Sequence, residues 1–72
     1  NSIKYFPNPT DGLLNILYEG EIQTIVLDIK GKEIIKTDKK IIDLINLNKG
    51  IYILKVIDQS NKKIDFIKII KK

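Results

Sequence analysis

The chain has 72 residues, about half the usual length of one domain, so a single small module is expected and a two-domain enzyme is excluded. Hydrophobic residues make up 43% of the chain, which is enough for a small compact core. His, Cys, Met, Trp and Arg are absent, which removes zinc and haem ligands, disulfides and the nucleophile-base pairs of covalent hydrolases. We therefore expect no enzymatic activity, no metal and no cofactor.

The formal net charge of +4 is unevenly distributed along the chain. Residues 1–48 hold six lysines and seven acidic residues, whereas residues 49–72 hold seven lysines and two acidic residues. This asymmetry suits an acidic partner, although lysines also protect exposed strand edges. Nucleic acid is not expected as a partner, because Arg is absent and only five residues are aromatic. No apolar run approaches the roughly 20 residues of a transmembrane helix.

Short runs of β-branched and aromatic residues, separated by Gly, Asn, Asp or Pro, predict strands throughout the chain. The turn formed by Pro7 to Gly12 ends the first strand, and Lys30-Gly31 predicts a hairpin. The segment 41–47 is ambiguous between helix and strand, and its β-branched content favours a strand. The seven predicted strands are 3–6, 12–18, 22–30, 32–37, 41–47, 50–57 and 63–71.

Seven short strands with turns about every ten residues predict an all-β fold, a small immunoglobulin-like antiparallel β-sandwich. An open, partly closed barrel is the alternative. The run Ile25-Val26-Leu27 is apolar on both faces and predicts a central strand. Alternation places Leu14, Ile16 and Tyr18 on one face of the second strand and Leu13, Asn15 and Leu17 on the other. In the sixth strand it predicts that Tyr52, Leu54 and Val56 point inward.

Two motifs are distinctive: Tyr5-Phe6-Pro7-Asn8-Pro9-Thr10-Asp11-Gly12, and 46–56 with Gly50 and Tyr52. Each also has a plain structural interpretation, the first as a rigid turn between strands and the second as a strand that begins at a glycine. A calcium site using Thr10 and Asp11 has little support, because the other oxygen ligands of such loops are missing.

At these residues the sequence resembles the type A C-terminal sorting domains of proteins that Bacteroidetes export by the type IX (Por) secretion system. The resemblance spans the whole chain. It lies in the Phe6-Pro7-Asn8-Pro9 opening with Gly12, the turn 27–32, the stretch 47–56 and the basic end Lys68-Ile69-Ile70-Lys71-Lys72. The chain departs from the pattern at Asn48, where proline is common, and at Leu27, where an aromatic residue is common.

The resemblance implies a folded secretion signal without catalytic activity. Residues 1–72 would be one sorting domain cut from a larger exported protein, attached to an N-terminal cargo domain and carried through the periplasm to the cell surface or the medium. The implied partners are the type IX translocon, an outer-membrane shuttle protein and a cysteine-peptidase-type sortase that cleaves near or before Asn1. Candidate recognition residues are Pro7, Asn8, Pro9, Gly12, Gly50, Tyr52, Lys68, Lys71 and Lys72.

The residues alone leave two other functions as alternatives. An accessory module that binds carbohydrate or mediates adhesion needs a row of exposed aromatic side chains, whereas Tyr5, Tyr18 and Tyr52 are expected to lie inward or apart from one another. A structural or dimerising sandwich needs an uncharged exposed edge, and the many lysines near strand ends argue against one.

Overall fold

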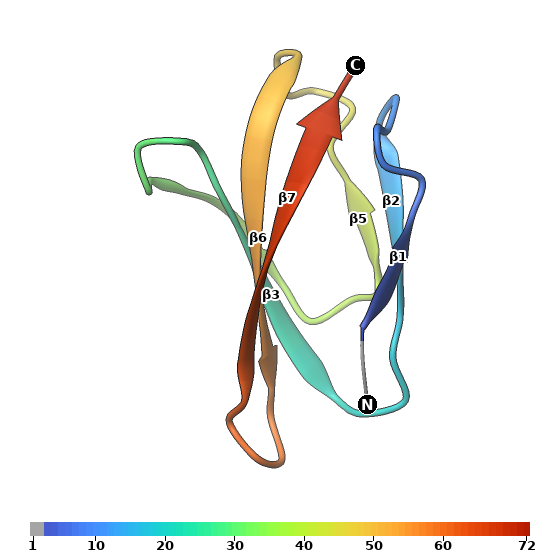
Figure 1. Cartoon of the computed structure of the whole chain (residues 1–72), viewed down its shortest axis with the longest axis vertical. Helices are drawn as coiled ribbons and strands as arrows, with labels where there is room; N and C mark the ends of the chain where they lie inside the picture. Colours follow the sequence, from blue (N-terminus) through green and yellow to red (C-terminus); the bar gives the residue numbers. More distant parts are fainter. Residues whose placement is uncertain (1–2) are drawn as a thin grey trace.

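The computed structural model describes residues 3–72, which form seven β-strands and no helix. Strands β1, β2 and β5 form one antiparallel sheet in that order, and the other four form a second sheet in the order β4-β3-β6-β7. The two sheets face each other as a sandwich (Figure 1). The predicted fold class is thus confirmed. The strands are β1 (Lys4–Phe6), β2 (Leu13–Leu17), β3 (Ile22–Leu27), β4 (Glu33–Thr37), β5 (Ile41–Asp43), β6 (Gly50–Asp58) and β7 (Ile64–Lys71).

The core lies between the two sheets and is made by alternate residues of the longer strands. Strand β2 contributes Leu14 and Ile16, which share one face of the strand as expected, while Tyr18 lies just past the strand and is half-buried. Strand β6 contributes the predicted set of Tyr52, Leu54 and Val56. The remaining buried apolar residues are Ile22, Val26, Ile42, Leu44, Ile67 and Ile69.

Strand β3 is central, as predicted, because it pairs with β4 on one side and β6 on the other. Its two faces differ in burial. Val26 is fully buried between the sheets, whereas Ile25 and Leu27 are half-buried on the outer face. The apolar residues on that outer face are covered only in part, by their neighbours in the same sheet.

The hairpin predicted at Lys30-Gly31 joins β3 to β4, and β3 ends at Leu27 rather than at Lys30. It ends there because the Oδ1 atom of Asp28 accepts hydrogen bonds from the backbone N–H groups of Lys30 (2.8 Å) and Lys32 (2.9 Å). Gly31 has a φ of 87°, a left-handed conformation that a residue with a Cβ rarely adopts.

The strand predicted for 41–47 is shorter than expected, since β5 covers only Ile41–Asp43. The Oδ1 atom of Asp43 accepts a hydrogen bond from the N–H of Ile45 at 2.9 Å, which replaces a strand contact with a local turn. The N–H of Leu47 then donates to the carbonyl of Leu44 at 3.0 Å. This segment is therefore a short strand followed by a turn, and Leu44 is buried under it.

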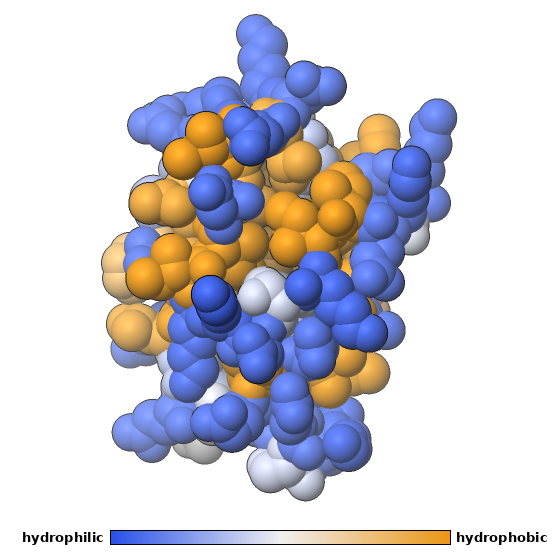
Figure 2. Space-filling view, turned by 180° about the vertical axis from the view of Figure 1, so that it is seen from behind, coloured by the Kyte–Doolittle hydropathy of each residue, from blue (hydrophilic) through white to orange (hydrophobic). Residues whose placement is uncertain are grey.

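Apolar side chains remain exposed on the outside of both sheets. Seen from behind, they gather in the middle and upper part of the molecule, while both ends are hydrophilic (Figure 2). No helix among the described residues is long and apolar enough to cross a membrane.

Candidate recognition surface

The turn after β1 is attached to the last strand of the domain. The N–H of Thr10 donates to the carbonyl of Ile70 at 2.9 Å, and the N–H of Lys72 donates to the carbonyl of Thr10 at 2.8 Å. These bonds form a parallel bridge between Thr10 and Lys71. The loop between β1 and β2 and the end of β7 consequently lie at the same end of the sandwich (Figure 1).

The side chain of Asn8 extends this attachment along β7. Its Nδ2 atom donates to the carbonyl of Lys68, and its Oδ1 atom accepts from the N–H of Ile70, both at 3.0 Å. The amide thus takes the place of a neighbouring peptide group on the outer edge of the sheet. These two bonds give hydrogen-bonding partners to backbone groups that an edge strand otherwise leaves without a partner in the sheet.

Thr10 and Gly12 hold the turn from inside. The hydroxyl of Thr10 is buried, donates to the carbonyl of Leu13 at 2.7 Å and accepts from the N–H of Gly12 at 3.1 Å. Gly12 is also buried, and a Cβ added to it would lie 2.4 Å from the Cγ1 atom of Ile45. The motif therefore contains residues that support the turn as well as residues that the turn exposes.

A shallow depression of about 430 Å³ opens beside this turn. The residues around it include the buried Thr10 and Gly12 and the exposed Ile45. Within residues 3–72, no group of three acidic side chains could hold a metal ion, so the Thr10 and Asp11 region offers no cluster of carboxylates. The lining residues are Pro7, Thr10, Asp11, Gly12, Leu13, Asn15 and Ile45.

The basic C-terminal residues differ in what they present to solvent. Lys68 is exposed. Lys71 is only 8% exposed, and its Nζ atom donates to the carbonyls of Leu47 at 3.3 Å and Lys72 at 3.2 Å. Lys72 is exposed and forms an ion pair with Asp11 at 3.7 Å. The predicted cationic end thus presents Lys68 and Lys72, while Lys71 closes the end of the core.

The second motif begins β6 at the same end of the domain. Gly50 pairs with Lys71, which in turn is bridged to Thr10, so these three residues form a row across the sheet. Gly50 is exposed, and its φ of 150° lies outside the range that other residues commonly adopt. The strand register therefore brings the two motifs and the basic C-terminal end together.

Tyr52 is only 8% exposed, and its hydroxyl donates to the carbonyl of Asn48 at 2.6 Å. This bond resembles the tyrosine corner of immunoglobulin-like sandwiches, in which a tyrosine near the start of a strand bonds to the backbone a few residues upstream. The bond from Tyr52 therefore holds the turn at Asn48 that leads into Gly50.

Sequence reasoning did not identify the polar cluster at the opposite end. There the carboxylate of Asp58 accepts hydrogen bonds from the hydroxyl of Tyr18, from the N–H of Ser60 at 2.8 Å and from the hydroxyl of Ser60 at 2.7 Å. The bond from Tyr18, followed by those from Ser60, holds the pKa of Asp58 well below its usual range. The bond to Asp58 raises the pKa of Tyr18. The spacing of Asp58 and Ser60 in the sequence indicates a turn. No nearby residue indicates that Tyr18, 40 residues away, also bonds to Asp58.

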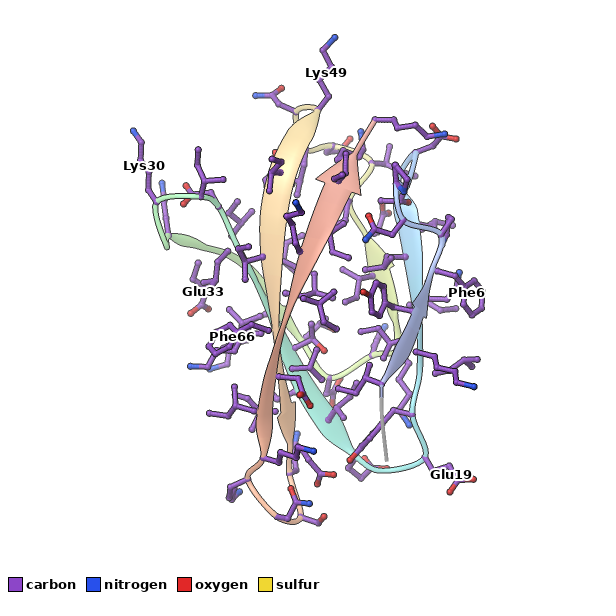
Figure 3. All side chains as sticks on the ribbon, viewed as in Figure 1. Phe6, Glu19, Lys30, Glu33, Lys49 and Phe66 are labelled. Atoms are coloured by element: carbon purple, nitrogen blue, oxygen red, sulfur yellow. The ribbon has the colours of Figure 1, made fainter. Side chains whose placement is uncertain are left out.

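The exposed aromatic side chains do not form a platform. Phe6 and Phe66 point away from opposite sides of the sandwich (Figure 3), and Tyr52 is buried. This separation among residues 3–72 gives no support to an accessory module that binds carbohydrate along an aromatic row.

The small sandwich thus carries its two sequence motifs and its basic C-terminal residues at one end. Comparison with protein families gives a match to the secretion system C-terminal sorting domain over residues 4–72. The chain belongs to this family. It is a C-terminal sorting domain of the Por (type IX) secretion system, a non-catalytic secretion signal that interacts with the secretion machinery and marks a secreted or cell-surface cargo. No curated protein matches the chain.

Proposed function

We propose that the secretion machinery recognises the folded domain at the end where the motifs meet. The observation that carries this proposal is the row formed by Gly50, Lys71 and Thr10 across β6, β7 and the first turn. We define the motif surface as the exposed residues at this end, namely Pro7, Asn8, Pro9, Gly50, Lys68 and Lys72. The buried candidates Gly12, Tyr52 and Lys71 support this surface from below.

In this proposal the partners of the motif surface are the type IX translocon and an outer-membrane shuttle protein. The exposed Lys68 and Lys72 would attract acidic groups on the partner, and the bonds from Asn8 keep the turn in register with β7. Because segments far apart in sequence build the surface, a partner that reads it distinguishes the folded domain from an unfolded chain.

The test is export of a periplasmic reporter fused to residues 1–72 in a Bacteroidetes host. The variant Lys68→Gln/Lys72→Gln changes only exposed side chains, and Lys39→Gln/Lys63→Gln is its matched control on exposed loops outside the family motifs. We expect the first pair to lower the exported fraction severalfold and the second to leave it unchanged. Equal export from the two double variants would contradict the proposal that the motif surface is the recognition site.

We also propose that the domain was cut from a larger exported protein, with a cargo domain before Asn1. The cargo passes through the periplasm, and a cysteine-peptidase-type sortase removes the sorting domain at the cell surface. The expected cleavage is near or before Asn1, and Asn1 lies outside the described residues. Mass spectrometry of the exported reporter tests this step, since a host without the sortase should retain residues 1–72 on the reporter. Identical products from both hosts would contradict it.

A further inference from the structure

The outer face of the four-stranded sheet is apolar and carries regularly placed lysines. Alternation places the side chains of β3, β6 and β7 that do not enter the core on this face. Phe66 is 65% exposed there. We define the lysine face as Lys36, Lys55 and Lys68 with the apolar residues Ile25, Leu27, Ile51, Ile53, Ile57, Ile64, Phe66 and Ile70.

Each lysine of this face lies directly opposite an apolar residue on the neighbouring strand. Lys55 pairs with Phe66, Lys68 with Ile53, and Lys36 with Ile25. Side chains that pair in this way are close enough for the apolar stem of each lysine to pack on its partner, with the charged ammonium group at the solvent side. The face therefore presents an apolar floor with cationic groups above it.

The charge of the lysine face separates it from the outer face of the other sheet. Three lysines stand against one acidic residue, Glu33, which pairs with Leu27 at the margin and points to the same side as Phe66 (Figure 3). The three-stranded sheet also exposes apolar residues, but there Lys4 is balanced by Asp43. An anionic partner is thus favoured on one of the two apolar faces only.

We propose that the lysine face adsorbs on an anionic lipid surface. Phe66 and its apolar neighbours enter the boundary between headgroups and acyl chains, and the ammonium groups of the lysines meet lipid phosphates. A protein partner fits less well, because lysine is depleted from protein interfaces. A second copy of the chain fits less well too, because it would bring like-charged lysines together.

This inference goes beyond recognition by the secretion machinery and involves the face of a sheet rather than one end of the domain. Lys68 belongs to both surfaces, so the experiment relies on Lys55 and Phe66 instead. Adsorption would hold the domain against a membrane through the outer face of one sheet. Pro7 to Pro9, at the end of the sandwich, are not part of that face. The proposal can fail without affecting the export experiment, because vesicles contain no secretion machinery.

The experiment measures partitioning of the 72-residue chain onto vesicles of phosphatidylcholine with and without phosphatidylglycerol. We expect binding only to the anionic vesicles, with Phe66→Ser lowering the partition coefficient roughly tenfold and Lys55→Gln roughly fivefold. The matched controls are Phe6→Ser and Lys4→Gln on the opposite face, which should bind like the unaltered chain. Circular dichroism of each variant confirms that the strands are retained.

Several outcomes would overturn the proposal. One is the absence of binding to anionic vesicles at low salt, and another is an equal loss from Phe6→Ser and Phe66→Ser. A loss from Lys55→Gln without any loss from Phe66→Ser would show only the general attraction of a protein with a net charge of +4. Binding to soluble polyglutamate but not to vesicles would assign the face to an acidic protein.

Discussion

Gly12 lies directly against Ile45, and a methyl group on Gly12 would approach the Cγ1 atom of Ile45 to 2.4 Å and its Cα atom to 3.4 Å. The two segments cannot separate freely, because the N–H of Leu44 donates to the carbonyl of Gly12 at 2.7 Å. The glycine of the first motif is thus required by packing between the start of β2 and the turn after β5.

We expect Gly12→Ala to lower the free energy of unfolding by about 1–3 kcal/mol, the usual cost of an inserted methyl group in a packed site. Ile45 is largely exposed, so Ile45→Ala alone should cost little. Urea unfolding of the single and double variants measures the coupling between them. If Gly12→Ala lowers the free energy of unfolding as much in the Ile45→Ala background as in the unaltered chain, the contact with Ile45 does not cause the loss.

The amide of Asn8 should slow hydrogen exchange at the outer edge of β7. Asn8→Ala removes both of its bonds, to the carbonyl of Lys68 and from the N–H of Ile70. We expect the Ile70 amide to exchange faster by roughly fivefold, which corresponds to one hydrogen bond of about 1 kcal/mol. Asn46→Ala, an exposed change in another turn, is the matched control. Unchanged exchange at Ile70 would show that the attachment does not persist in solution.

The pair formed by Tyr18 and Asp58 should limit stability at both extremes of pH. The pKa of Asp58 is lowered by folding, so its contribution is complete above the unfolded carboxyl pKa of roughly 3.9 and is lost as the pH falls below that value. The pKa of Tyr18 is raised, so its contribution is present below the unfolded pKa of roughly 10 and is lost as the pH rises above it. Thermal unfolding across this pH range measures both losses.

Tyr18→Phe should reduce the loss of stability at low pH and remove the contribution of Tyr18 to the loss at high pH, because it removes the hydrogen bond to Asp58. Tyr5→Phe, in β1, serves as the matched control and should retain the dependence of the unaltered chain. A Tyr18→Phe variant whose unfolding temperature changes with pH as steeply as that of the unaltered chain would show that other groups determine the dependence.

The hydroxyl of Tyr52 should stabilise the fold without being read directly by a partner. Tyr52→Phe removes the bond to the carbonyl of Asn48, and we expect the free energy of unfolding to fall by about 1 kcal/mol. Because the ring is buried, export of a reporter fusion should fall only as far as folding does. Strong loss of export from a Tyr52→Phe domain that is fully folded at the assay temperature would instead indicate direct recognition.

Much of the fold follows from local patterns. Alternation predicts that Leu54 and Val56 face the core, because successive side chains in a strand point to opposite faces. The same alternation places Lys71 on the face of Ile67 and Ile69, yet its charge suggests exposure. The structure buries it because the carbonyls of Leu47 and Lys72 accept hydrogen bonds from its ammonium group.

The sequence by itself determined the strand content and the main turns, because these depend on residues close together in the chain. It also determined the family, because the motifs follow one another in a fixed order along the chain. Only the tertiary structure decided which motif residues are exposed and which support them. The partner of Asn8 lies 60 residues away in β7, and the row of Thr10, Lys71 and Gly50 depends on strand register. No local pattern encodes such pairings, since they form only when the two sheets close around a common core.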